Sequence, residues 1–351
     1  MSWVQELARP DIVALHPYQH ASWEPGLERL HANELPWRPA DDDSLAGLNR
    51  YPEPQPRALI ERLAELYAVA PASVLVGRGS DEAIDLLTRA FCRAGSDAVL
   101  VCPPTFGMYS VCARIQGAEV LQTPLAAADG FALDEHALLG RCTAAVKLVF
   151  LCSPNNPTGN LLDEAAILRI ARRLAGRALV VVDEAYIEFA GRPSLTRLVA
   201  ELPNLAILRT LSKAYGLAGA RCGSLIADPE IIALLRKIIP PYAIPQLTLE
   251  AVLHRLTPEA LVRSRQALEV LLAERERLLR ALPRLRRIAR VWPTSANFVL
   301  VEFDDPAQAL ARGREARLLV RDARGYPGLG RALRITVGTP EQNGRLLEAW
   351  S

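Results

Sequence analysis

Short apolar runs alternate with amphipathic segments through the middle of the chain. The runs have the length of buried strands and lie at residues 74–77, 98–102, 146–152, 178–183, 206–210 and 222–227. Segments 81–94 and 163–176 fall between such runs and carry apolar residues at the three- and four-residue spacing of helices. This alternation predicts an α/β fold with a doubly wound, largely parallel sheet.

The pattern changes after Pro245. A long amphipathic segment at 258–282 predicts a helix, and later runs predict strands at 287–291, 296–303, 317–320 and 331–337 before a closing helix at 340–350. The first 45 residues are rich in proline and show little periodicity, which indicates an extended arm. We therefore expect an arm with part of the small domain at 1–45, a large domain at 46–245 and a small α+β domain at 246–351.

Composition narrows the class of protein. The formal charge of the 351 residues is only +2, and the arginines are interspersed with 39 acids, which argues against a nucleic-acid surface. No apolar run approaches the length of a membrane span, and the N-terminus does not resemble a secretion signal, so we expect a cytoplasmic protein. Six cysteines without a C-x-x-C pair favour reduced, packed thiols, and five scattered histidines show no metal-ligand spacing.

A hydroxyl-rich turn after the run at 206–210 carries Lys213. Only three of the 41 basic residues are lysines, so a lysine at this position suggests a chemical role that arginine cannot fill. A lysine amine can lose its proton and form a Schiff base, whereas arginine cannot. Thr210, Ser212 and Arg221 surround it in sequence and suit a phosphate dianion. An amine beside a group of phosphate-binding side chains suggests pyridoxal phosphate. The dipeptide Ser212-Lys213 by itself more often marks a lysine that only closes a polar loop.

Polar residues also follow the other predicted strands, at the sheet edge where doubly wound folds bind ligands. Asp183 ends a strand of four apolar residues, where it would either meet a pyridinium nitrogen or cap a helix. Tyr186 lies three residues further on and can reach the phenolic oxygen of the coenzyme. Asn156, in the turn CSPNNPTGN, can reach the same oxygen and is a better candidate than Asn155, although an Asn-Pro turn without a ligand is common.

Two further turns and two predicted strands of the small domain supply candidate residues for binding the coenzyme or a substrate. A glycine-rich turn opens the helix at 81–94 and forms a possible phosphate site from the backbone amides of Gly79, Ser80 and Asp81. Phe106, in CPPTFGMY, would stack on the coenzyme ring or be plain core. Arg321 and Arg334 lie on separate predicted strands, and in a chain so rich in arginine a single one is most often a solvated surface residue. Arg334 alternates with apolar neighbours, so it can instead lie in a pocket and bind an anionic substrate.

Taken in order, these motifs resemble the histidinol-phosphate aminotransferases, a family within the pyridoxal-phosphate enzymes of fold type I. The resemblance covers nearly the whole chain. It rests on LHANELP, RYPEPQP, GRGSDEAIDLL, CPPTFGMYSV, CSPNNPTGN, VVVDEAYIEF, RTLSKAYGLAGARCG and LRITVGT. The chain departs from the family where Phe106 replaces a frequent tyrosine, which retains stacking but removes a hydroxyl.

The resemblance implies a role for each candidate. Lys213 would bind the coenzyme covalently and shuttle the substrate proton, while Asp183 would pair with the ring nitrogen. The phosphate would be held by Thr210, Ser212, Arg221 and the turn at 79–81, helped by Tyr51 from a partner subunit. The substrate would be bound by Tyr18, Asn33, Arg321 and Arg334.

The implied reaction transfers the amino group of L-histidinol phosphate to 2-oxoglutarate, giving imidazole acetol phosphate and glutamate in a homodimer with shared sites. Threonine-phosphate decarboxylases and broad aromatic aminotransferases share this scaffold, and the cofactor residues do not separate them. A non-catalytic regulator module would need a DNA-binding extension, which the sequence does not show.

Overall fold

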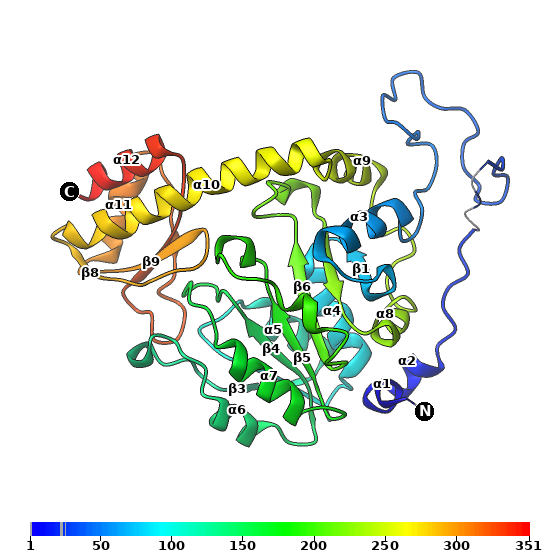
Figure 1. Cartoon of the computed structure of the whole chain (residues 1–351), viewed down its shortest axis with the longest axis horizontal. Helices are drawn as coiled ribbons and strands as arrows, with labels where there is room; N and C mark the ends of the chain where they lie inside the picture. The colour runs from blue at the N-terminus through cyan, green and yellow to red at the C-terminus, as the bar shows by residue number, and fades with distance from the viewer. Residues whose placement is uncertain (1, 22–23, 25) are drawn as a thin grey trace.

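The computed structural model of the protein describes residues 2–21, 24 and 26–351 (Figure 1). Its largest element is a seven-stranded sheet in the order β1-β7-β6-β5-β4-β2-β3. The strands are β1 (Val74–Gly77), β2 (Ala98–Val101), β3 (Glu119–Gln122), β4 (Val146–Cys152), β5 (Leu179–Asp183), β6 (Leu205–Thr210) and β7 (Gly223–Ile226). Strand β7 runs antiparallel to both neighbours, and the other neighbouring pairs are parallel. The predicted α/β fold with a largely parallel sheet is confirmed.

The strands form where the sequence places apolar runs. In β5 every residue is buried, and successive side chains enter opposite clusters, Leu179 and Val181 on one face and Val180 and Val182 on the other. All six predicted strands of this sheet are present. Strand β3 was not predicted, because it lies at the sheet edge with partly exposed side chains and lacks a continuous apolar run.

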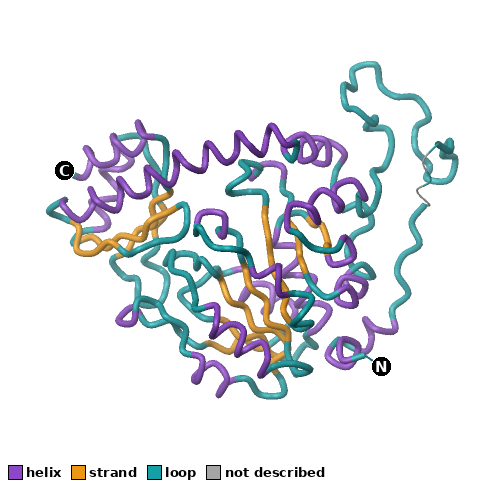
Figure 2. The backbone as a smooth tube through the Cα atoms, viewed as in Figure 1, coloured by secondary structure: helices purple, strands orange, loops and turns teal. Residues whose placement is uncertain are grey.

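Helices cover both faces of this sheet (Figure 2). One face packs against α3 (Arg57–Tyr67), α6 (Glu135–Arg141), α7 (Glu164–Arg173) and α9 (Gln246–Arg255), and the other against α4 (Ser80–Phe91), α5 (Met108–Gln116) and α8 (Pro229–Leu235). The predicted helices at 81–94 and 163–176 are thus α4 and α7. The Asp163 carboxylate starts α7 by accepting from the backbone amides of Ala165 and Ala166.

A smaller domain, called the small domain below, follows the long helix α10 (Pro258–Ala281). This helix runs from α9 to the C-terminal end of the molecule in Figure 1. The small domain contains an antiparallel sheet in the order β10-β11-β9-β8 and two helices. The elements are β8 (Ile288–Val291), β9 (Phe298–Phe303), α11 (Pro306–Glu315), β10 (Arg321–Asp322), β11 (Ala332–Thr336) and α12 (Pro340–Trp350). No helix among the described residues is long and apolar enough to cross a membrane.

The predicted strand at 317–320 is wrong. The chain leaves α11 through Arg317, which has a left-handed φ of 58°, and the backbone amide of Leu318 then bonds to the carbonyl of Gly313. Leu319 is exposed. Residues 317–320 therefore form the turn that ends the helix, and strand pairing begins only at Arg321.

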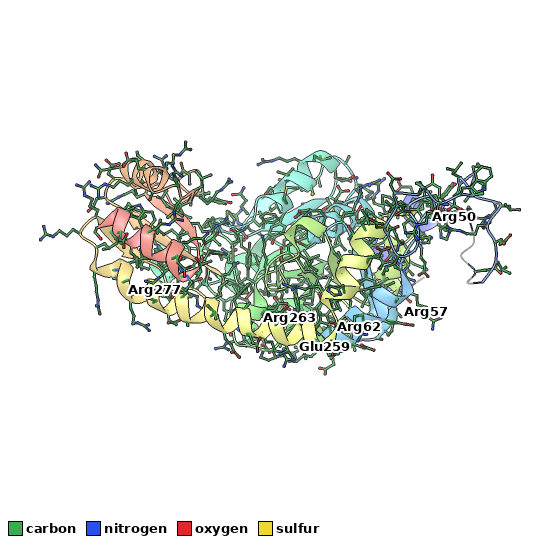
Figure 3. All side chains as sticks on the ribbon, turned by 90° about the horizontal axis from the view of Figure 1, so that it is seen from above. Arg50, Arg57, Arg62, Glu259, Arg263 and Arg277 are labelled. Atoms are coloured by element: carbon green, nitrogen blue, oxygen red, sulfur yellow. The ribbon has the colours of Figure 1, made fainter. Side chains whose placement is uncertain are left out.

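The described part of the N-terminal arm has two regions. Helices α1 (Trp3–Leu7) and α2 (Pro10–Ala14) lie beside the large sheet, where Val4 and Leu7 are buried with residues of α4 and α8. The chain beyond α2 leaves the body of the molecule before returning at α3, and Arg50 lies at this end, opposite Arg277 (Figures 1 and 3). Large apolar side chains on this outer stretch, including Leu30 and Trp37, are exposed.

Candidate active site

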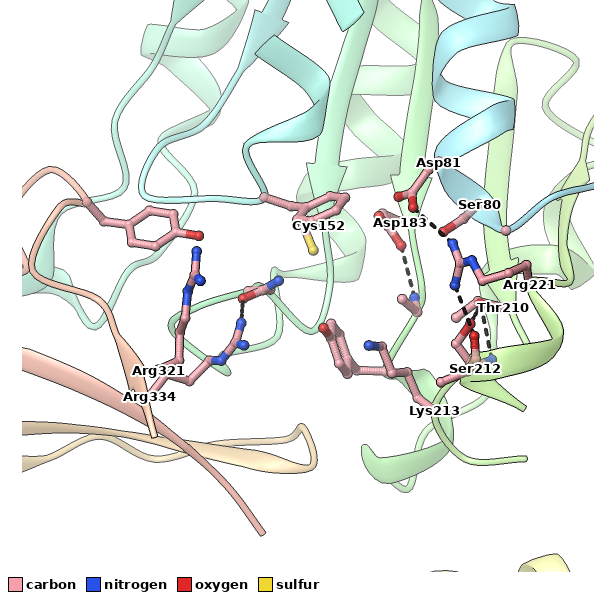
Figure 4. A pocket seen from close by; sticks show the side chains of 17 residues that line it. Ser80, Asp81, Cys152, Asp183, Thr210, Ser212, Lys213, Arg221, Arg321 and Arg334 are labelled. Atoms are coloured by element: carbon pink, nitrogen blue, oxygen red, sulfur yellow. Dashed lines mark hydrogen bonds and ion pairs between the residues drawn. The ribbon is translucent and has the colours of Figure 1, made fainter. Parts of the chain in front are cut away.

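A cavity of about 310 Å³ opens where the parallel strands end, between the large sheet and the small domain. Its size suits a small molecule. Strands β4, β5 and β6 deliver Cys152, Asp183 and Thr210 to its wall as their last residues. Most of the residues predicted from the sequence line it, namely Gly79, Ser80, Asp81, Phe106, Asn156, Asp183, Tyr186, Thr210, Ser212, Lys213, Arg221, Arg321 and Arg334 (Figure 4).

Lys213 lies between two groups of polar side chains in this cavity. Ser80, Thr210 and Arg221 lie on one side of it, and Arg334 lies on the other (Figure 4). Its Nζ is 5.8 Å from the centre of the Tyr186 ring. Burial, followed by the positive charge of Arg334, lowers the pKa of the Lys213 amine. A larger fraction of the amine is therefore in the neutral, nucleophilic form than for a surface lysine.

Asp183 is a carboxylate buried at the floor of the cavity, only 3% exposed. The Tyr109 hydroxyl donates to its Oδ2 at 2.7 Å, and the backbone amide of Ala185 donates to its Oδ1 at 3.0 Å. Burial raises the pKa of Asp183 to about 6, although these donors oppose the rise. The carboxylate contacts no arginine or lysine within ion-pair distance among the described residues, so a cationic ring nitrogen would supply the missing charge.

One end of the cavity is a cradle for a dianion. Helix α4 begins at Ser80, after Gly79 adopts a φ of 86°, and the free amides of its first turn attract negative charge. Thr210 Oγ1 and Ser212 Oγ lie 3.0 Å apart, and Arg221 extends its guanidinium to 3.3 Å from Asp81. Amides, hydroxyls and a guanidinium together form the donor set that a phosphate needs.

Gly223 allows this cradle to form. A Cβ at this position would lie 2.3 Å from the backbone nitrogen of Ser80, far inside any normal contact. The absence of a side chain lets β7 pass against the start of α4. The amides of that turn and Arg221 are thereby brought to the same end of the cavity.

The two asparagines of the CSPNNPTGN turn have different environments. Asn155 is buried in structural hydrogen bonds, accepting from Thr105 at 2.8 Å and donating to the Pro104 carbonyl at 2.8 Å. Asn156 lines the cavity, and its Oδ1 accepts from the Arg334 guanidinium. This leaves the Asn156 amide nitrogen as the donor available to a ligand. The sequence-based preference for Asn156 over Asn155 agrees with this geometry.

Arg321 and Arg334 face each other directly across strands β10 and β11. They therefore share one face of the small sheet, and both line the cavity. The Arg334 guanidinium lies 5.1 Å from the ring of Phe298, and its Nε is buried without a hydrogen-bond partner among the described residues. An unsatisfied buried donor is costly, so an anion bound here would satisfy it.

Three predicted residues do not lie in this cavity. Tyr18 and Asn33 are exposed on the outer stretch of the arm. Tyr51 stacks on Tyr242 with ring centres 4.5 Å apart. The single chain therefore does not bring these side chains to Lys213.

The cavity also contains residues that sequence reasoning missed. Cys152, Ala185 and Tyr326 line it, and Tyr109 lies behind Asp183. Cys152 and Ala185 could have been predicted as cavity residues, because they lie at or just after the ends of strands. Tyr326 comes from a loop of the small domain and carried no such signal.

The assembled donors fit pyridoxal phosphate on chemical grounds. The cavity offers one amine for the coenzyme's aldehyde, one buried carboxylate for its ring nitrogen and a cradle for its phosphate. Phe106 adds an aromatic side chain to the wall. Each polar group of the coenzyme thus has a counterpart among residues of this cavity.

Comparison with known proteins agrees with this geometry. A sequence profile of the family described as "Aminotransferase class I and II" matches residues 36–349. The histidinol-phosphate aminotransferase of Stenotrophomonas maltophilia is 49% identical over 353 residues, covering 99% of this chain and 96% of its own. That of Xylella fastidiosa strain 9a5c is 50% identical, covering 91% and 87%.

Solved structures share the fold. The histidinol-phosphate aminotransferase of Clostridium acetobutylicum superimposes with a TM-score of 0.79 at 22% identity, covering 86% of this chain and 90% of its own. The enzyme of the same name from Sinorhizobium meliloti, solved in complex with pyridoxal-5'-phosphate, gives 0.77 at 25% identity, covering 86% and 82%. The chain belongs to the class I and II aminotransferases, which use pyridoxal 5'-phosphate, and the relatives that match it over nearly its full length include histidinol-phosphate aminotransferases.

Proposed function

We propose that the protein transfers the amino group of L-histidinol phosphate to 2-oxoglutarate, giving imidazole acetol phosphate and L-glutamate, in L-histidine biosynthesis. The observation that carries the proposal is the position of Lys213 between a dianion cradle and the cavity-lining pair Arg321 and Arg334. The first site suits the coenzyme's phosphate, and the second suits an anionic substrate. Relatives named for this reaction support the choice, since they match at 47–50% identity.

The coenzyme would be held at four points. Thr210, Ser212, Arg221 and the first amides of α4 would bind its phosphate, and Asp183 would bind the protonated ring nitrogen. Phe106 would pack on the ring, while Asn156 and Tyr186 would donate to the phenolic oxygen. When bound, pyridoxal phosphate supplies an electron sink next to the amine-bearing carbon of the substrate. Because Asp183 is buried, its charge acts on the ring nitrogen with little screening by water.

Lys213 would act as both anchor and proton carrier. Burial lowers the pKa of the Lys213 amine, which favours its neutral, nucleophilic form; once released, the same amine is a base able to accept a proton from the substrate carbon. The same amine can return that proton in the second half of the reaction. Arg334 would bind the α-carboxylate of glutamate, and with Arg321 it would bind the phosphate of histidinol phosphate. The buried Nε of Arg334, which has no hydrogen-bond partner within the described part of the chain, supports this role.

We also propose that the working enzyme is a homodimer in which the arm of one subunit completes the site of the other. Tyr18, Asn33 and Tyr51 lie outside the cavity of their own chain. The stretch that carries Tyr18 and Asn33 exposes several large apolar side chains, which favours contact with another surface. All six cysteines are free and buried, which fits a reducing compartment, so we propose a cytoplasmic location.

The half-reaction tests the substrate. The enzyme loaded with pyridoxal phosphate is mixed with L-histidinol phosphate and no keto acid, with threonine phosphate and phenylalanine in parallel. We expect the visible absorption band to convert to the pyridoxamine form, fastest with histidinol phosphate, and to return on addition of 2-oxoglutarate. Faster conversion with another amine would overturn the substrate assignment.

A pair of lysine variants provides the control. Lys213→Ala should abolish the conversion, because it removes the amine in the cavity. Lys147→Ala, on β4 outside the cavity, should leave it unchanged. Equal loss in the two variants would show that the absorption change does not report on Lys213.

A further inference from the structure

Tyr109 lies directly behind the cavity wall and is fully buried, with 0% of its surface exposed. It is the second residue of α5, three positions after Phe106. Its ring stacks on Phe150 at 4.8 Å with an interplanar angle of 3°, and the edge of Phe106 meets it at 5.6 Å and 83°. Two aromatic contacts therefore fix the ring, and with it the direction of the hydroxyl.

That hydroxyl has a defined role in hydrogen bonding. It donates to Oδ2 of Asp183 at 2.7 Å, a normal length for a charge-assisted bond. Burial and the negative charge of Asp183 raise the pKa of Tyr109 well above its ordinary value, so the phenol remains protonated and acts as donor. The backbone amide of Ala185 occupies the other oxygen. A donor from helix α5 and a donor from the turn after β5 thus hold both oxygens of the carboxylate.

The contact matters because Asp183 is otherwise poorly supported. Burial favours its neutral form, and the Tyr109 hydrogen bond is the largest influence opposing that effect. Without the hydroxyl, the backbone amide of Ala185 would be the single donor left to the Asp183 side chain among the residues that the structure describes. It would then be both less oriented and less readily ionised.

We propose that Tyr109 is a positioning residue of this site: through its hydrogen bond to Oδ2 it orients the Asp183 carboxylate toward the coenzyme's ring nitrogen and favours its charged form. The inference rests on the proposed pairing of Asp183 with that nitrogen. Tyr109 does not line the cavity, so its influence passes through Asp183.

Tyr109→Phe removes one oxygen and keeps the ring contacts. Apoenzyme would be titrated with pyridoxal phosphate, and separately with the analogue in which the ring nitrogen is replaced by C–H. We expect the variant to bind pyridoxal phosphate roughly tenfold more weakly, the effect of one hydrogen bond to a charged group. The affinity for the carbocyclic analogue should be unchanged, because that ring offers nothing for Asp183 to pair with.

Two controls separate positioning from general damage. Tyr67→Phe removes another buried hydroxyl, one without a hydrogen-bond partner in residues 2–21, 24 and 26–351, and should leave both affinities unchanged. In an Asp183→Asn background, Tyr109→Phe should cost much less, because its target charge is gone. This double-mutant comparison remains decisive if the single variant is partly destabilised.

Equal weakening of both ligands, or no weakening of either, would overturn the role of Tyr109. These titrations contain no substrate, so their failure is distinct from failure of the proposed reaction. A normal half-reaction with histidinol phosphate alongside an unselective Tyr109→Phe variant would leave the function standing and remove only this inference.

Discussion

Replacing the buried carboxylate of Asp183 by an amide should stabilise the coenzyme-free protein. Asp183→Asn keeps the size of the side chain and both hydrogen bonds, because Oδ1 can accept from Ala185 and the new amide can donate to the Tyr109 oxygen. It removes a charge that lies 3% exposed and has no cationic partner within ion-pair distance among the described residues. The coenzyme supplies that cation only when it is bound.

The size of the effect follows from the pKa. A rise from 3.8 to about 6 corresponds to roughly 3 kcal/mol of lost stability at pH 7.5, where the carboxyl is ionised in both states. The folded state binds the proton more tightly, so wild-type stability falls as pH rises from about 4 to 6 and is then level. At pH 5 the loss is only about half as large. Asparagine does not titrate, so its advantage should grow by roughly 1 kcal/mol between pH 5 and 7.5.

Urea-induced unfolding of the apoenzymes at one protomer concentration measures this growth directly. The informative quantity is the change with pH in the difference between the unfolding free energies of variant and wild type. Any pH-independent effect of exchanging Asp for Asn cancels in that change. With pyridoxal phosphate present the order should reverse, since Asp183 then has its partner and the variant binds the coenzyme more weakly. An apoenzyme difference that is constant from pH 5 to 7.5 would refute the reasoning, because Asp183 would then not carry a raised pKa.

Three further predictions follow from the same structure. Lys213→Arg should abolish transamination, and borohydride reduction followed by mass spectrometry should show no covalent coenzyme, which the wild type retains. Gly223→Ala should destabilise the protein by roughly 1–3 kcal/mol in urea and weaken coenzyme binding, because its Cβ would lie 2.3 Å from the Ser80 nitrogen. Arg209→Met should cost roughly 3–5 kcal/mol in urea, because the partner Glu188, 2.5 Å away, would be left as a largely buried, unpaired charge.

The fold and much of the site could be predicted from local sequence. A strand of a parallel sheet that is buried on both faces is mostly apolar, so its end is marked where the residues become polar, as at Asp183. Parallel strands end at one edge, and the polar residues that follow them therefore converge. This explains why reading the ends of apolar runs found the residues around Lys213.

Local pattern failed where an element depends on its neighbours. The run at 317–320 has the letters of a strand, yet the chain turns through Arg317 and finishes α11 before pairing begins. Strand β3 shows the reverse. Its sequence is partly polar, yet it forms a strand because β2 offers a free edge for pairing. Whether a segment joins a sheet is a property of the available partner as much as of the segment.

Contacts between distant segments had no signature in the sequence. The Tyr109 hydroxyl meets Asp183 across 74 residues, and Arg334 meets Asn156 across 178. The second contact exists because the small domain packs on the large one through Tyr186 and Phe298, whose rings meet edge to face at 5.2 Å. Residue types and strand ends are encoded locally by the cost of burying polar groups, whereas pairings across the fold arise only when separate apolar surfaces are buried against each other.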